Sequence, residues 1–216
     1  NYDYDYDPNE IIKCDKIDLF FKRNYNKRKI YNENVVPFPF IMFGEVSLIE
    51  KILEKNLNYE IEKINRIFFT GTLFHHNDEQ LNYVRDRSSI YNKIKEVIYN
   101  PGIMPYNKFL SEIRHSKYSL DLNGVGDPNK RTFEILSQGS LMISENNDLK
   151  WPFENGDEFN HELKFRDEKE FYKIMDKLNK NPDFYKNCLE NQNNIFNKYF
   201  NKIWIRDYIL IYIYNV

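Results

Sequence analysis

Two cations and a carboxylate follow a glycine-rich stretch of the chain at a spacing that suits ligand binding. Lys130, Arg131 and Glu134 come directly after the sequence Asn123–Asp127 (NGVGD). Glycine allows the backbone to approach a ligand closely. Cations and free N–H groups at the start of a helix suit a phosphate, and a carboxylate suits the hydroxyls of a sugar. The pattern therefore predicts a site for a ligand that carries both phosphate and sugar.

The elements around these residues must bring them to one edge of a sheet. We predict a buried strand at Tyr118–Leu122, a helix that carries the charged residues, and a second strand at Leu141–Ser144. Open α/β sheets bind ligands at the carboxyl ends of their strands, which is where this turn and helix start would lie. Arg131 and Glu134 are three positions apart and share a helix face, while the apolar residues of the helix form its buried side.

A second glycine turn precedes this region. Gly71 and Thr72 end a predicted strand at Ile67–Thr72, where the backbone could again approach a ligand. Two alternatives stay open: an ordinary strand-to-helix turn at Gly71, and a solvated ion pair between Arg131 and Glu134. A nicotinamide cofactor is disfavoured, because the two glycines of the NGVGD sequence match a dinucleotide fingerprint only in part. The predicted ligand contacts are Gly71, Thr72, Asn123, Gly124, Gly126, Asp127, Lys130, Arg131 and Glu134.

The run from Ser116 to Ile143, SKYSLDLNGVGDPNKRTFEILSQGSLMI, resembles the donor-binding motif of GT-B glycosyltransferases, most closely the exostosin-like and CAP10-like branches. Arg131, Glu134, Gly139 and Ser140 fall on the positions of that motif. The resemblance implies that Arg131 contacts the diphosphate of a nucleotide sugar and that Glu134 holds its ribose. It also implies transfer to an acceptor without a metal or other cofactor. The likeness covers about Asn65 to Asp207.

This resemblance and the alternation of strands with helices predict a Rossmann-like, three-layer α/β/α fold with a mostly parallel sheet. Residues 61–216 would form the nucleotide-sugar-binding domain, and residues 1–60 an N-terminal extension or the remnant of an N-terminal GT-B domain. The other expected elements are strands at Ile17–Phe21, Gly102–Met104 and Leu163–Phe165, extended chain at Val35–Phe43, and helices at Val46–Lys55, Glu79–Tyr99, Tyr106–His115, Glu168–Leu178 and from Pro182. The last segment, Ile203–Tyr214, permits a strand because of its β-branched and aromatic residues, and we prefer a C-terminal helix.

Bulk properties exclude some classes of protein. A net charge of −2 and a pI near 6.2 argue against a general nucleic-acid binder. We find no signal peptide and no apolar run long enough to span a bilayer. Cys14 and Cys188 form no metal-ligand pattern, which favours two buried thiols in a reducing compartment such as the cytoplasm. The abundance of Asn, Lys, Ile, Tyr and Phe fits the mutational bias of an AT-rich genome.

Other residues that could do chemistry also have a non-functional interpretation. They are the adjacent His75 and His76 with Asp78 (a base or metal site, or a solvated loop), Asp3, Asp5 and Asp7 (a metal-binding motif, or an acidic tail), and Arg85 and Arg87 (a contact to an anionic donor, or solvated surface). No residue can be assigned as the catalytic base. A non-catalytic nucleotide-sugar-binding or assembly domain therefore remains the alternative function. A phosphate-handling hydrolase is disfavoured, since neither a P-loop nor a nucleophile elbow is present.

Overall fold

The computed structural model describes residues 19–22, 25–38, 61–73, 87–123, 129–154, 156 and 159–214. The elements in these ranges are β1 (Phe20–Lys22), β2 (Val35–Pro37), β3 (Ile64–Phe68), α3 (Arg87–Ile94), β4 (Ile98–Tyr99), α4 (Tyr106–His115), β5 (Ser116–Asp121), α5 (Lys130–Ser137), β6 (Leu141–Glu145), β7 (Lys164–Phe165), α6 (Glu168–Lys180), α7 (Pro182–Tyr199) and α8 (Lys202–Tyr214). The predicted helix at Val46–Lys55 lies outside the described residues.

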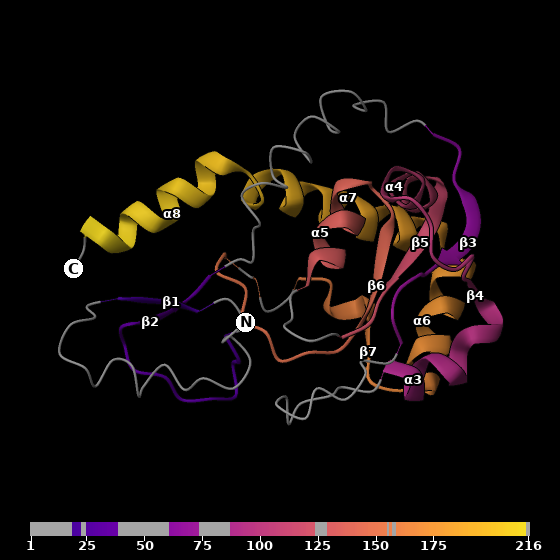
Figure 1. Cartoon of the computed structure of the whole chain (residues 1–216), viewed down its shortest axis with the longest axis horizontal. Coiled ribbons are helices and arrows are strands. Elements are labelled where there is room, and N and C mark those ends of the chain that lie inside the picture. Colours follow the sequence, from indigo (N-terminus) through magenta and orange to yellow (C-terminus); the bar gives the residue numbers. More distant parts are fainter. Residues whose placement is uncertain are drawn as a thin grey trace.

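Five strands form one parallel sheet in the order β4-β3-β5-β6-β7 (Figure 1). The chain passes from β3 outward to β4 on one side, and then returns to place β5, β6 and β7 on the other side. The direction of winding therefore reverses between β3 and β5. Such a reversal leaves a crevice at the carboxyl ends of the two strands, which is where open parallel sheets bind ligands.

Helices cover both faces of this sheet, as the predicted three-layer α/β architecture requires. Helices α3 and α6 and the first half of α7 pack on one face of the sheet and form a first core with it. Helices α4 and α5 and the last turns of α7 pack on the other face and form a second core. Side chains alternate along each strand, so Ile67 enters the first core and Phe68 the second. The Rossmann-like prediction is confirmed, and α4 has the predicted bounds.

Two side-chain amides replace a missing part of the β6–β7 ladder. Strand β7 pairs only with Ser144 and Glu145, so the start of β6 has no strand neighbour on that side. The Gln192 amide of α7 accepts a hydrogen bond from Met142 N at 2.9 Å, and its Nε2 donates to Ser140 O at 2.8 Å. Asn160 donates to Met142 O at 2.7 Å. These contacts satisfy buried backbone groups that would otherwise be costly.

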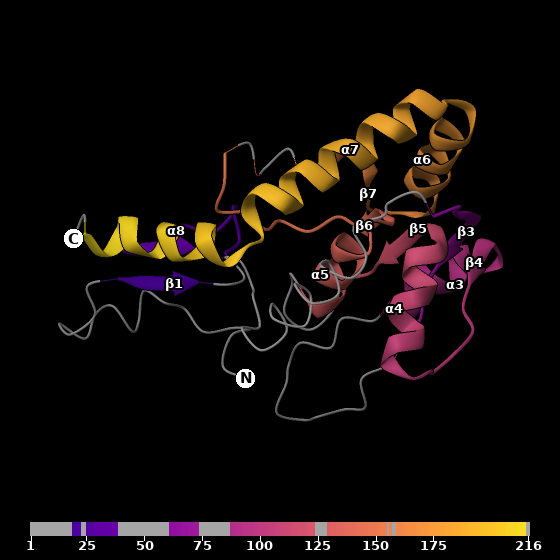
Figure 2. The ribbon, with the colours of Figure 1, turned by 90° about the horizontal axis from the view of Figure 1, so that it is seen from above.

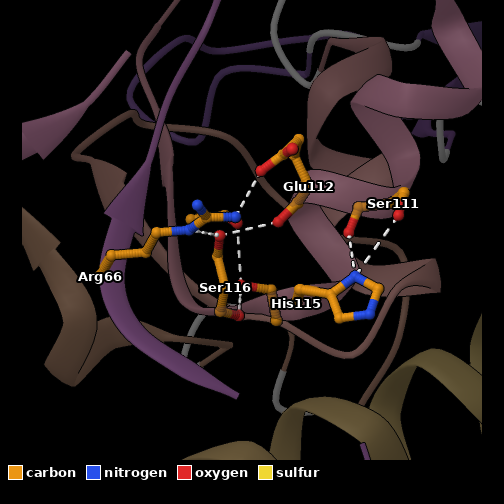
Figure 3. A network of polar contacts seen from close by, with 7 residues as sticks. Arg66, Ser111, Glu112, His115 and Ser116 are labelled. Carbon is orange, nitrogen blue, oxygen red and sulfur yellow. Dashed lines mark hydrogen bonds and ion pairs between the residues drawn. The ribbon is translucent and has the colours of Figure 1, made fainter. Parts of the chain in front are cut away.

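A polar network fastens α4 to the amino-terminal edge of the sheet (Figure 3). Arg66 of β3 donates through Nε to Ser116 Oγ at 2.9 Å and forms an ion pair with Glu112. The Arg66 guanidinium also lies 4.1 Å from the centre of the Tyr99 ring. His115 Nδ1 lies 2.7 Å from Ser111 O. Because this network lies at the edge opposite the carboxyl ends of the strands, we assign it to positioning α4.

The N-terminal strands β1 and β2 form a separate two-stranded parallel sheet beside α8 (Figure 2). The Tyr208 hydroxyl donates to Pro37 O at 2.6 Å, and the Phe21 ring meets Tyr212 edge-on at 6.1 Å. The predicted C-terminal helix is confirmed. Residues 35–37 of the predicted extended segment form a short strand outside the main sheet, in accord with the prolines that were expected to keep it from a central position.

Four predictions were wrong in detail. Strand β3 covers Ile64–Phe68 rather than Ile67–Thr72, so Gly71 and Thr72 lie beyond its end. The helix expected to reach Tyr99 ends at Ile94, because Ile98 pairs with Ile67 as an edge strand. Ile98 is β-branched and Tyr99 is aromatic, and both residue types favour a strand over a solvent-facing helix end. Gly102–Met104 forms no strand, and Gly102 has a φ of +80°, in the left-handed region. Cys188 is half-buried rather than buried, and Cys14 lies outside the described residues.

Candidate ligand-binding site

A pocket of about 360 Å³ lies at the switch point between β3 and β5. Residues just after the two strands line it together with the starts of three helices. The lining residues are Phe69, Arg87, Tyr106, Phe109, Leu122, Asn129, Lys130, Arg131 and Glu134. The structure thus brings together all three charged residues that the sequence singled out, at the predicted edge of the sheet.

The start of α5 places these charged residues. Asn129 caps the helix, since its side-chain oxygen accepts a hydrogen bond from Arg131 N at 2.8 Å. Phe133 and Leu136 anchor the helix in the core under the sheet. With that face buried, the charged side chains of the first turn of α5 line the pocket, with Lys130 partly exposed to solvent.

Arg131 is a largely buried cation that lies on aromatic rings. Its guanidinium carbon lies 4.6 Å from the centre of the Phe109 ring and 5.8 Å from that of Phe69. Its Nε lies 3.5 Å from Glu134 Oε2, within ion-pair range, yet it is buried and forms no hydrogen bond to any described residue. Burial lowers the pKa of Arg131, and the nearby carboxylates oppose that shift. An arginine nevertheless stays charged at neutral pH, so the pocket is lined by a largely buried cation.

Glu134 is buried and lies between two cations. Its side chain is 7% exposed, and Lys130 Nζ lies 3.8 Å from its Oε1. The same Lys130 ammonium lies 4.7 Å from the centre of the Tyr106 ring, which brings α4 to the rim of the pocket. The alternative of a solvated surface pair therefore does not describe Glu134.

Arg87, at the start of α3, is held by the ends of both central strands. It donates through Nε to Asn123 O at 2.8 Å and through Nη1 to Thr72 O at 3.2 Å. Thr72 and Asn123 do not line the pocket, and the Asn123 side chain donates to Asn146 O. Both residues thus orient Arg87 through their carbonyl groups, and their direct contact to a ligand stays a prediction.

Gly71 lies beside the Arg131 guanidinium. A Cβ at this position would lie 3.6 Å from Arg131 Nη2 and 3.7 Å from the Phe69 ring. The neighbouring Thr70 directs its hydroxyl to Gly102 O at 2.7 Å, away from any ligand role. The remaining sequence-predicted residues lie outside the described part of the chain: Gly124, Gly126, Asp127, His75, His76, Asp78, Arg85, Asp3, Asp5 and Asp7.

Sequence reasoning missed Asp121, a buried carboxyl at the end of β5. It accepts a hydrogen bond from Thr132 Oγ1 at 2.6 Å and a longer one from Asn129 Nδ2 at 3.5 Å. Burial raises its pKa, while Thr132, the guanidinium of Arg131 and that of Arg87 oppose the rise. The available signal was strand alternation, because Leu120 and Leu122 enter one core and so turn Asp121 towards α5.

A parallel sheet with a switch point and a basic pocket at its carboxyl edge defines a Rossmann-like α/β protein. Residues 60–201 match the family described as glycosyl transferase-like, so the chain belongs to this family and its α/β domain is of GT-B type. The matched range agrees with the extent of the resemblance seen in the sequence. A search of curated proteins found no match. Among the described helices, none has the length and apolarity needed to cross a membrane.

Proposed function

We propose that this chain binds a nucleotide-diphosphate sugar in the pocket between β3 and β5 and transfers the sugar to an acceptor. Membership of the glycosyl transferase-like family supports a general glycosyltransferase role. The observation that carries the finer proposal is the convergence of three cations, Arg87, Lys130 and Arg131, with the buried carboxylate of Glu134 in the lining of one pocket. Such a lining suits an anionic ligand that also offers hydrogen-bond donors.

The diphosphate would lie against the start of α5. Arg131 offers a planar guanidinium that suits two phosphate oxygens at once, and Lys130 adds a point charge at the rim. Arg87 faces the same space from α3. The N-terminus of α5 contributes its partial positive charge to the same site. Three cations would stabilise the charge that develops on the departing nucleoside diphosphate, so the reaction we propose needs no metal.

The ribose would lie next to Glu134. A buried carboxylate strongly favours partners that donate hydrogen bonds, and a ribose offers two adjacent hydroxyls. Glu134 lies one helical turn after Lys130 in α5. This spacing suits a nucleotide sugar, in which the ribose is joined directly to the diphosphate. Gly124, Gly126 and Asp127 would complete the contacts from the turn that precedes α5.

The test measures binding and turnover separately. The chain is titrated calorimetrically with nucleotide sugars that differ in base, and each mixture is then examined for free nucleotide and for glycosylated product. Binding together with transfer or slow donor hydrolysis supports the proposal. Binding without either reaction supports the non-catalytic alternative. Failure to bind any nucleotide sugar or nucleoside diphosphate would contradict both.

A further inference from the structure

Asp121 lies behind the proposed donor site and does not line it. Both of its carboxylate oxygens accept hydrogen bonds, one from Thr132 and one from Asn129. Hydrogen bonds accepted on both oxygens favour the ionised form, whereas burial raises the pKa of the Asp121 carboxyl. The structure therefore places a carboxyl whose charge depends on pH beneath the first turn of α5.

The same two arginines serve this charge and the pocket. Arg131 donates through its backbone N to Asn129, which in turn donates to Asp121. Arg87 donates to Asn123 O, two residues beyond Asp121. Both arginines line the pocket, and both oppose the rise in the pKa of Asp121. An anion in the pocket would thus share its counter-ions with a buried carboxylate of like charge. At low effective dielectric, two such negative charges repel each other over several ångströms.

We propose that Asp121 is a positioning residue that acts through Arg131 and Arg87, competes with the donor diphosphate for these cations and so limits the affinity of the site. The inference rests on the proposed donor-binding function. Its consequence is that the charge of Asp121 helps to release the nucleoside diphosphate after transfer.

Among the residues that the structure describes, the other charges near Asp121 do not supply an equivalent repulsion from behind the site. Glu134 lies within the pocket lining, in contact with Lys130 and Arg131. Glu145, at the end of β6, accepts a hydrogen bond from Asn123 N at 3.0 Å. On α4, Glu112 pairs with Arg66 at the opposite edge of the sheet, beside Arg114 and His115.

Competition predicts a link between donor binding and protonation of Asp121. A bound diphosphate disfavours the ionised carboxylate, so binding raises the pKa of Asp121 further and takes up a proton. By linkage, donor affinity is higher where Asp121 is protonated and falls as pH rises through its pKa. Nucleotide sugars are suitable probes, because their esterified diphosphate has no group that titrates near neutral pH.

The main test compares the wild-type chain with Asp121→Asn by calorimetry between about pH 5 and pH 8, in buffers of different ionisation enthalpy. The amide keeps the size of the side chain and removes only its charge. We expect Asp121→Asn to bind a nucleotide sugar about tenfold more tightly than wild type at the upper end of this range. We also expect its affinity to be nearly independent of pH, with no proton uptake at this residue.

Thr132→Val is a matched second variant that leaves the charge in place. The Thr132 hydroxyl lowers the pKa of Asp121, so its removal should move the pH dependence of affinity to higher pH. If Asp121 only supported the fold, its substitution would instead weaken donor binding. Equal or weaker binding by a folded Asp121→Asn, with an unchanged pH profile, would overturn the inference.

The controls separate this inference from the proposed function. If wild type binds no nucleotide sugar, the donor site itself is wrong and the inference falls with it. If wild type binds but takes up no proton and Thr132→Val leaves the pH profile in place, only the role of Asp121 is wrong. These two measurements decide the matter even if Asp121→Asn does not fold.

Discussion

The guanidinium of Arg131 rests on the Phe109 ring, with 4.6 Å between the guanidinium carbon and the ring centre. This contact joins α5 to α4 across the mouth of the switch point. Phe109 is itself buried in the core on that face of the sheet, so the cation lies on a fixed surface. A cation held in place before the ligand arrives loses little side-chain entropy on binding.

Phe109→Leu should therefore weaken donor binding while leaving the helix packed. Removal of a cation–π contact costs about 0.5–2 kcal/mol, which predicts roughly twofold to thirtyfold lower affinity. Calorimetry with a nucleotide sugar measures the change. Phe159→Leu is the control, because Phe159 lies in the same apolar cluster and does not line the pocket. Equal losses of affinity in both variants would attribute the effect to general core damage.

Glu134→Gln should reduce the preference for ribose over 2′-deoxyribose. The amide can replace a carboxylate in size, but it loses the charge-assisted hydrogen bond to a hydroxyl, worth about 1.5–3 kcal/mol. Wild type is therefore expected to prefer a ribonucleotide over its 2′-deoxy analogue by about tenfold or more, and Glu134→Gln by much less. Competition binding with the two nucleotides measures both ratios. A preference that survives in the variant would place the ribose elsewhere.

Gly71→Ala and Gly71→Val should differ sharply. A single Cβ would lie 3.6 Å from Arg131 Nη2, an ordinary contact, so alanine should leave donor affinity within about twofold of wild type. The extra methyl groups of valine would push the guanidinium away from its position, with a loss of roughly tenfold. Thermal unfolding shows whether both variants fold. Similar affinity in the two variants would mean that Gly71 does not set the position of Arg131.

Gln192→Leu should destabilise the fold without a specific effect on the pocket. Leucine fills similar space but leaves Met142 N and Ser140 O, both inside the core, without partners. Each buried group left unsatisfied costs about 1–3 kcal/mol, so for two groups the free energy of unfolding should fall by about 2–6 kcal/mol. Urea unfolding measures it. A loss below about 0.5 kcal/mol, as for an ordinary surface change, would show that other groups replace the amide.

Local patterns were sufficient to predict most of the sheet and the charged part of the site. Helix α4 has the predicted bounds because its apolar face is a local signal. The first turn of α5 was equally predictable, since charged residues and an apolar side follow each other directly. The edge strand β4 was missed because two residues are too few to show alternation, and only pairing with Ile67 settles their state.

Contacts between distant parts of the chain could not be predicted in this way. In the sequence, Gln192 is one polar residue among several in an Asn-rich helix. Its role depends on the start of β6, which lies some 50 positions earlier and has no strand neighbour on that side. In the sequence, Asp121 is a polar residue within a strand. The fold brings Arg87 and Arg131 towards it, and these cations then favour its ionised form. In both cases the deciding factor is tertiary burial of a polar group.

The most direct test of the central claim is donor affinity in Arg131→Lys and Arg131→Met, measured calorimetrically with the nucleotide sugar that wild type binds best. Methionine keeps an apolar stem over Phe109 but removes the charge, and lysine keeps the charge but loses the planar pair of donors. We predict about tenfold weaker binding for lysine and at least about a hundredfold for methionine, with both proteins folded. Wild-type affinity in a folded Arg131→Met would contradict a diphosphate site at the start of α5.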